Sequence, residues 1–144
     1  MQALSKTRRT RELTPPLVIE ANHHQKLLRF ASAASGTMPE VSDFLARELE
    51  RARIVPAGSL KDGLVGMGSE VSFRDENTGR VQDVVLVYPP EADIEQRRIS
   101  VLTPIGAALL GLACGQTITF HTRSGERREL TILGASRNAT HEQL

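Results

Sequence analysis

Two acidic side chains, Glu40 and Asp43, lie three residues apart directly after Met38-Pro39, where the pattern predicts that a second helix begins. Two carboxylates at an exposed tip could hold a divalent cation through water if a partner supplied further oxygen ligands. The alternative is structural, because acidic residues in the first turn of a helix stabilise its dipole by some tenths of a kcal/mol. The residues by themselves favour this second interpretation.

The histidines and the cysteine predict no metal centre and no cofactor site. His23 and His24 are adjacent and therefore point to different parts of a helix surface, while His121 and His141 are isolated in the sequence. Cys114 has no Cys-x-x-Cys partner, and its apolar neighbours predict a buried, inert thiol. We find no catalytic constellation and expect a protein that is not an enzyme.

Composition narrows the class of protein further. A single cysteine among 144 residues excludes an internal disulfide framework. The longest run free of both charged and strongly polar residues, Ile105 to Cys114, is far shorter than a membrane helix, and no apolar stretch of a secretory signal follows the basic N-terminus. We therefore expect a soluble cytoplasmic protein with no membrane partner. Aromatic residues make up only 3%, which argues against base-stacking recognition of nucleic acid.

The charge is unevenly distributed along the chain. Residues 1–14 carry four basic and one acidic side chain, a net charge of +3, and have almost no apolar residues. Such a segment cannot offset its ordering entropy by burial, so we expect a disordered basic tail there, and a flexible C-terminus over residues 137–144. Residues 15–55 are neutral and residues 56–144 sum to −2, so direct sequence-specific binding to nucleic acid is not expected.

Residues 15–55 predict a short antiparallel helical hairpin, or coiled coil. Asn22 is a candidate N-cap, and residues 35–39, with Gly36 and Pro39, break the pattern between the two arms. Each arm has about 14 residues and reaches roughly 20 Å. The two apolar stripes consist of Leu27, Leu28, Ala31 and Ala34, and of Val41, Leu45, Leu49 and Ala52.

Residues 56–136 predict a second unit of the α+β class, an antiparallel sheet packed on one short helix. Thr103 and Pro104 have the residue types of an N-cap and a first helical position, and the run from Val81 to Tyr88 is the best candidate for a central strand. Ile118 and Phe120 would face inward from a later hairpin. The remaining strands are expected over residues 70–75, 99–102, 117–122 and 127–133.

Three segments of this unit carry a resemblance: Val87-Tyr88-Pro89, the run Ile99-Ser100-Val101-Leu102-Thr103-Pro104-Ile105-Gly106-Ala107-Ala108-Leu109-Leu110-Gly111-Leu112, and Gly115-Gln116-Thr117-Ile118. They resemble the C-terminal domain of the bacterial Gre transcript-cleavage factors. The resemblance is closer still to the family of the regulator of nucleoside diphosphate kinase, which combines that domain with a short coiled coil. The resemblance implies an FKBP-like fold for the sheet and a partner, RNA polymerase.

In Gre factors this domain docks on the rim of the secondary channel of RNA polymerase, and the resemblance implies a docking segment over Leu102, Thr103, Pro104 and Ile105. Thr103-Pro104 match the Ser-Pro dipeptide of the family. Leu102 stands where the cleavage factors often carry Asp or Asn, which implies a more apolar contact.

The resemblance also gives the tip a second interpretation. Gre factors deliver an Asp and a Glu to the polymerase active site, where they help to hold a second Mg²⁺. Glu40 and Asp43 have a comparable spacing in reversed order, but arms of roughly 20 Å are about half the length that such a delivery needs.

We therefore expect a non-enzymatic regulator that competes with Gre factors at the channel. The name of the relatives adds an effect on nucleoside diphosphate kinase levels. A Gre-like cleavage factor and an FKBP-type peptidyl-prolyl isomerase are the alternatives, and the isomerase is disfavoured because the chain has no Trp for the pocket floor. The oligomeric state stays open.

Overall fold

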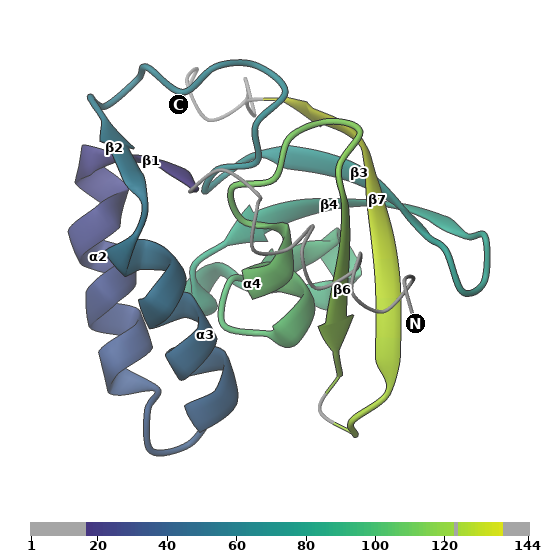
Figure 1. Ribbon diagram of the computed structural model, residues 1–144, viewed down its shortest axis with the longest axis horizontal. Helices are drawn as coiled ribbons and strands as arrows, with labels where there is room; N and C mark the ends of the chain where they lie inside the picture. The colour runs from purple at the N-terminus through teal and green to yellow at the C-terminus, as the bar shows by residue number, and fades with distance from the viewer. Residues whose placement is uncertain (1–16, 123, 137–144) are drawn as a thin grey trace, which may run out of the picture.

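Two helices that pack side by side form the first half of the structure. The computed structural model describes residues 17–122 and 124–136, so the segments predicted to be a tail (1–14) and a flexible C-terminus (137–144) lie outside it. Helix α2 spans Ala21–Ala33 and α3 spans Pro39–Glu50, and Figure 1 shows them next to each other at one side of the molecule. Strand β1 (Val18–Glu20) precedes α2, and β2 (Arg53–Val55) follows α3; these two strands pair in parallel.

The packing of α2 on α3, hereafter the helical pair, uses the predicted stripes. Leu27, Leu45 and Leu49 are fully buried, as are Ala31 and Ala34, while Leu28, Val41 and Ala52 pack partly buried around them. Two hydrogen bonds cross between the helices: Ser42 Oγ donates to the Ala31 carbonyl oxygen at 2.6 Å, and His24 Nε2 donates to that of Leu49 at 2.9 Å. Helix α2 begins at Ala21, one residue before the predicted cap Asn22, and the cap position is Glu20.

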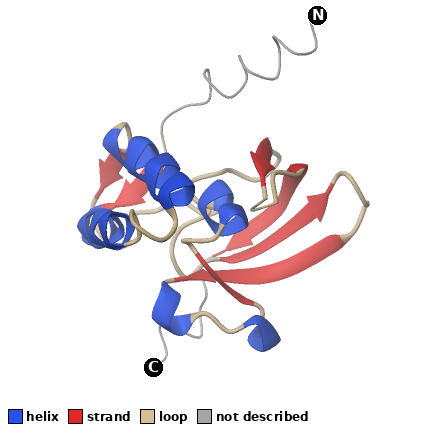
Figure 2. Cartoon of the chain, turned by 90° about the horizontal axis from the view of Figure 1, so that it is seen from below, coloured by secondary structure: helices blue, strands red, loops and turns tan. Residues whose placement is uncertain are grey.

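The second half is a curled sheet of five strands with one helix against it. The sheet order is β5-β4-β3-β7-β6. The strands are β3 (Glu70–Asp75), β4 (Val81–Val87), β5 (Arg98–Ser100), β6 (Thr117–His121) and β7 (Arg127–Ser136), with the short 3-10 turns η1 (Pro89–Glu91) and η2 (Ile94–Gln96) between β4 and β5. Helix α4 spans Pro104–Leu109. In Figure 2, α4 lies between the sheet and the helical pair.

The α+β class is confirmed, but the prediction of a wholly antiparallel sheet is wrong. Strand β5 pairs with β4 in parallel, because the chain crosses over through η1 and η2 rather than turning back in a hairpin. Strand β4 has a neighbour on each side, β5 and β3, so the prediction of a central strand at Val81–Tyr88 is confirmed. Strand β3 lies in the middle of the order, paired with β4 on one side and with β7, across a bulge at Ser72/Phe73, on the other.

One core continues from the sheet into the helical pair. Val71 and Phe73 of β3 and Leu130 and Ile132 of β7 are almost fully buried, together with Leu109 of α4. Burial of this kind stabilises by about 25 cal/mol for each Å² of apolar surface removed from water. The same cluster includes Leu27 and Leu45, so the two halves of the described chain share their apolar interior.

Tyr88, which follows β4, makes the polar part of this junction. Its hydroxyl shares a hydrogen bond of 2.6 Å with His23 Nδ1 on α2. The Phe30 ring stacks on it at 5.2 Å between centroids, and Lys26 Nζ lies 4.2 Å above its ring. Burial raises the pKa of the Tyr88 hydroxyl, so this group stays protonated and available for the bond.

Candidate functional site

The start of α4 is built by a local network of hydrogen bonds. Thr103 Oγ1 accepts from Gly106 N at 3.0 Å and donates to the Ser100 carbonyl oxygen at 2.8 Å. Pro104 occupies the first helical position, where its missing N–H costs nothing. Ser100 Oγ in turn accepts from Leu102 N at 3.0 Å. The predicted cap and helix start are therefore confirmed, and the turn presents a fixed surface.

Gly106 is required in this turn by close approach. A Cβ at this position would lie well inside 3.0 Å of the Ser100 carbonyl oxygen, which is backbone and cannot move aside. The absence of a side chain lets the first turn of α4 pack directly on the end of β5. This brings Thr103 and Pro104 close beside the sheet.

The four residues of the predicted docking segment differ in exposure. Leu102 is buried and belongs to the core, whereas Thr103, Pro104 and Ile105 are half-buried. Leu102 therefore holds the segment from beneath. The surface that a partner can touch consists of Thr103, Pro104 and Ile105.

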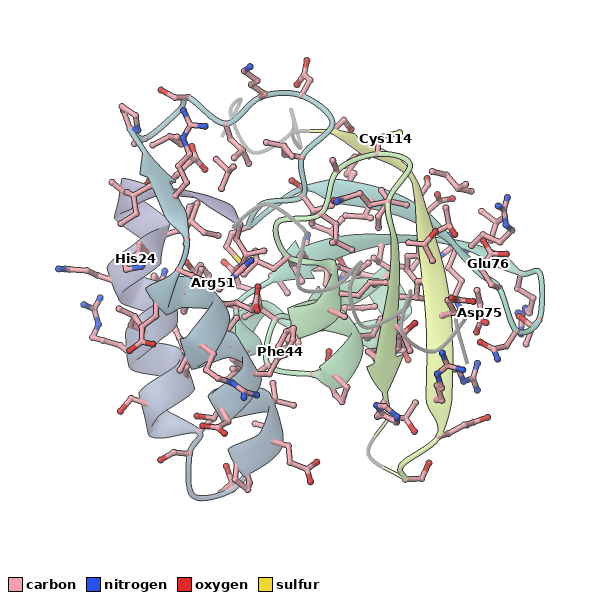
Figure 3. All side chains as sticks on the ribbon, in the orientation of Figure 1. His24, Phe44, Arg51, Asp75, Glu76 and Cys114 are labelled. Carbon is pink, nitrogen blue, oxygen red and sulfur yellow. The ribbon has the colours of Figure 1, made fainter. Side chains whose placement is uncertain are left out.

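An apolar depression lies beside Pro104, between α3, α4 and β6. Its larger chamber has a volume of about 620 Å³, and a smaller chamber of about 130 Å³ adjoins it, with Phe44, Ala107, Ala108 and Ile118 common to both. We call the two chambers together the trough. Figure 3 shows Phe44 on α3, where the helical pair faces α4. The larger chamber is further lined by residues 37–41, Pro104 and residues 119–122.

The trough was not predicted from the sequence, although part of its wall carries a signal. Phe44 is a large apolar residue of α3 that lies outside the stripe of Val41, Leu45, Leu49 and Ala52. Phe120, predicted to face inward, is half-buried and lines the larger chamber from β6. Ile118 is buried as predicted.

Glu40 lies in the first turn of α3 and Asp43 in the next turn, and both side chains are exposed. Glu40 also lines the larger chamber of the trough. The structure thus places one of the two carboxylates, Glu40, where a negative charge stabilises the helix dipole. Over residues 17–122 and 124–136, no three His, Cys, Asp or Glu side chains come close enough together to hold a metal ion.

The histidines have separate surroundings. His23 and His24 face Tyr88 and Leu49 respectively, so they do not converge, and His121 lies on the wall of the trough. Burial lowers the pKa of His23; Glu20 opposes this shift and Lys26 adds to it. His141 lies outside the described residues.

Cys114 is exposed, so the prediction of a buried thiol is wrong. Helix α4 ends at Leu109, and the chain then turns at Gly111 and Gly115, both with positive φ. Cys114 therefore sits in a surface turn rather than on the apolar face that its neighbours form. Its Sγ lies 3.2 Å from the Leu133 carbonyl oxygen.

A charged cluster at the opposite end of the sheet serves the fold. Buried Asp75 accepts from Arg128 Nη1 at 2.6 Å and from Asn77 N at 2.8 Å, which holds the turn after β3 against β7. The hydrogen bond to Asp75 raises the pKa of Arg128, and a hydrogen bond from Thr131 lowers that of Glu76. Figure 3 shows Asp75 and Glu76 far from the helical pair.

None of the helices in the described part of the chain is long and apolar enough to cross a membrane. The longest of them, α2, has 13 residues and carries Lys26 and Arg29.

Comparison with known proteins places these features in a family. Residues 60–137 match the family model described as "Transcription elongation factor, GreA/GreB, C-term". The regulator of nucleoside diphosphate kinase of Escherichia coli K12 is 36% identical over 93 residues, which are 65% of this chain and 68% of that protein. Transcription elongation factor GreA of Chloroflexus aurantiacus is 32% identical over 116 residues, 81% of this chain and 71% of that protein.

A solved structure agrees with the sequence matches. The prokaryotic transcription elongation factor GreA/GreB from Nitrosomonas europaea superposes with a TM-score of 0.70 at 31% identity, covering 85% of this chain and 99% of that one. The matched region contains α4 and all five strands of the curled sheet, and therefore the Thr103-Pro104 turn. The chain belongs to the GreA/GreB C-terminal family, and the regulator of nucleoside diphosphate kinase is among its relatives.

Proposed function

We propose that this protein is a non-enzymatic transcription regulator that binds bacterial RNA polymerase at the rim of the secondary channel and competes there with Gre factors. In this proposal residues 56–136 form an FKBP-like docking domain, and residues 15–55 form a short coiled coil that enters the channel. The site of action is the cytoplasm. The names of the relatives supply the transcriptional role, and that of the Escherichia coli relative adds an effect on nucleoside diphosphate kinase levels.

The observation that carries the proposal is the capped turn at the start of α4. The segment that matches the family's docking dipeptide, Thr103-Pro104, is fixed by three hydrogen bonds and is partly accessible. A preformed contact surface loses little conformational entropy on binding. The trough beside Pro104 adds apolar surface that a partner can cover.

The size of the helical pair supports regulation rather than cleavage. Helices of 13 and 12 residues are roughly 20 Å long, so Glu40 and Asp43 at their tip would stop inside the channel, short of the active site. A protein that occupies the rim without reaching the catalytic Mg²⁺ blocks a longer factor from the same path.

The test is binding to core RNA polymerase, followed by displacement with GreA. We expect binding at micromolar concentration or tighter and loss of binding as GreA is added. Pro104→Asp should weaken binding by about tenfold, because it puts a charge into an apolar contact, while an Asp at the first position of a helix is itself favourable for folding.

Pro90→Asp is the matched control, since Pro90 is exposed in η1 and lies outside the trough. It should bind like the unmodified protein. Absence of binding at micromolar concentration overturns the proposal. Equal loss with both variants overturns the assignment of Pro104 to the contact.

The isomerase alternative is tested separately with a short proline-containing peptide. The chain has no Trp, and its one Tyr, Tyr88, is hydrogen-bonded to His23 of α2 and does not line the trough. We expect no acceleration of proline isomerisation, and measurable turnover would reverse this assignment.

A further inference from the structure

The trough begins where the chain enters the described structure. Leu17, the first described residue, lines the smaller chamber and is packed against Gly111. Its carbonyl oxygen accepts from Arg53 N at 2.6 Å, so its position is fixed by the backbone. The N-terminal segment, residues 1–16, is therefore attached at one end of the trough.

The trough continues from this point along α3 toward the tip. Glu48 lines the smaller chamber, Phe44 lines both, and Glu40 lines the larger chamber. These residues span about two turns of α3, a rise of roughly 12 Å. A chain leaving Leu17 along α3 therefore passes Phe44 before it reaches Glu40.

The residue spacing of the N-terminal segment fits this path. Extended backbone covers roughly 3.3 Å per residue, so the four residues that separate Leu13 from Leu17 could span roughly 13 Å, enough to pass from the smaller chamber to the larger one. Pro15 and Pro16 favour extended backbone between these two leucines. Arg11 is two residues further from Leu17, a separation of roughly 20 Å in an extended chain, which is sufficient to span the trough as far as Glu40.

The charges are complementary. The N-terminal segment carries a net charge of +3. Among the described residues that line the trough, the acidic side chains are Glu40 and Glu48, and the basic one is Arg51, which lies 3.8 Å from Glu48. The wall therefore has a net charge of −1 with histidine neutral, and Glu40 is the acidic residue farther from Arg51 along α3.

We propose that the N-terminal segment occupies the trough of its own chain, with Leu13 between Phe44 and Phe120 and Arg11 beside Glu40. The segment then covers Pro104, which lines the same chamber. If the proposed function holds, the N-terminal segment and RNA polymerase compete for this face, and the segment lowers the affinity of the regulator for its partner.

The absence of Trp from the chain gives a direct test of occupancy in the isolated protein. Leu13→Trp introduces a single reporter at the proposed position, and Gln2→Trp is the matched control in the same segment. We expect blue-shifted emission and several-fold weaker acrylamide quenching for the first variant only. Equal spectra and quenching for the two variants overturn the proposal.

A second pair of variants removes the dependence on a bulky reporter. In a Cys114→Ser background, cysteines replacing Leu13 and Val41 should form an intramolecular disulfide under mild oxidation, because Val41 lines the larger chamber. Cysteines replacing Gln2 and Val41 should not. Failure of the first pair, or equal yield from both, contradicts occupancy, and a concentration-dependent intermolecular product overturns it in favour of a second copy.

The charge contact has its own test. Glu40→Lys or Arg11→Glu should return the emission of the Leu13→Trp protein toward that of the Gln2→Trp control, and the Arg11→Glu/Glu40→Arg pair should restore the blue shift. Restoration supports the Arg11–Glu40 contact. A blue shift that survives both single changes overturns this contact and leaves Leu13 as the anchor.

Competition is measured last, with core RNA polymerase and the Leu13→Asp variant. We expect this variant to bind several-fold more tightly than the unmodified chain. Equal affinity of the variant and the unmodified chain for polymerase overturns the proposed competition. Occupancy of the trough is then still decided by the fluorescence result. If neither protein binds polymerase, the proposed function fails, and the fluorescence and disulfide results decide occupancy independently.

Discussion

Gly106 determines how closely α4 approaches the end of β5. The Ser100 carbonyl oxygen stands where a side chain at residue 106 would begin, and it also accepts from Thr103 Oγ1. A substitution at residue 106 therefore disturbs both the helix cap and the strand end. The half-buried turn that contains Pro104 depends on this contact.

Gly106→Ala should lower the free energy of unfolding by about 1–3 kcal/mol, the usual cost of forcing atoms into a packed site. Urea denaturation followed by circular dichroism measures it. Gly36→Ala is the control, because a Cβ there would meet nothing within 4 Å, and it should change stability by less than about 0.5 kcal/mol. Equal stability of the two variants would contradict the close approach at Gly106.

His23 links α2 to Tyr88 and is the described histidine whose pKa is clearly shifted. Burial lowers this pKa below the ordinary value of 6.5, so the folded protein holds His23 neutral at pH 7. The unfolded chain binds the proton at higher pH than the folded chain does. Folding is therefore weakened as the pH falls through 6.5 toward the lowered pKa of the folded state.

We expect the free energy of unfolding to decrease between pH 7 and the acidic end of this window, with a contribution from His23 of at most about 1.4 kcal/mol per pH unit. His23→Gln should show a shallower pH dependence, because it removes the titrating group. The measurement is urea unfolding at a series of pH values. Parallel profiles for the two proteins would exclude His23 as the source.

At the scale of elements, the helical pair is held by leucine packing and by a buried cross-helix hydrogen bond. Ser42 is 6% exposed and donates to the Ala31 carbonyl oxygen, while Leu45 and Leu49 pack on the adjacent part of α2. Isolated helices of 12 and 13 residues are marginal in water, so the pair depends on these contacts and on the core beneath it.

Ser42→Ala should destabilise the protein by about 1 kcal/mol, the net value of one buried hydrogen bond. Ser35→Ala, in the exposed turn between the helices, serves as the comparison and should have little effect. Thermal unfolding of both variants beside the unmodified protein gives the difference. If Ser42→Ala is as stable as Ser35→Ala, the cross-helix bond contributes nothing.

At the scale of the whole molecule, the tip of the helical pair and the Thr103-Pro104 turn border the same chamber. Residues 37–41 and Pro104 line it together. A partner seated in the larger chamber would thus meet both halves of the chain at once. The shared core that joins the two halves keeps this arrangement fixed.

On a backtracked transcription complex, we expect the protein alone to leave the transcript intact and to reduce GreA-stimulated cleavage, with the reduction reversed by excess GreA. The reason is the length of the helical pair, roughly 20 Å, which is too short to bring Glu40 and Asp43 to the active site of the polymerase. Gel analysis of the transcript length measures both effects. Shortening by the protein alone that disappears in a Glu40→Ala/Asp43→Ala variant would instead identify a cleavage factor.

Features that local chemistry controls could be predicted from the amino-acid sequence. The cap at Thr103, the helix start at Pro104 and the buried stripes of α2 and α3 follow from residue types at helical spacing, and the alternation in β3 follows from period two. The resemblance to the Gre family could also be found from the sequence, because the segment around Thr103-Pro104 that carries it is contiguous. These predictions depend on neighbours within a few residues.

Features that join distant segments become visible only in the folded chain. The parallel pairing of β5 with β4 and the central place of β3 depend on strands far apart in the chain, and register between them is not encoded in either strand alone. Cys114 is exposed because the chain turns at Gly111 and Gly115, which its apolar neighbours do not reveal. The trough brings Phe44, Pro104 and Phe120 together from three elements, and only packing in three dimensions creates such a surface.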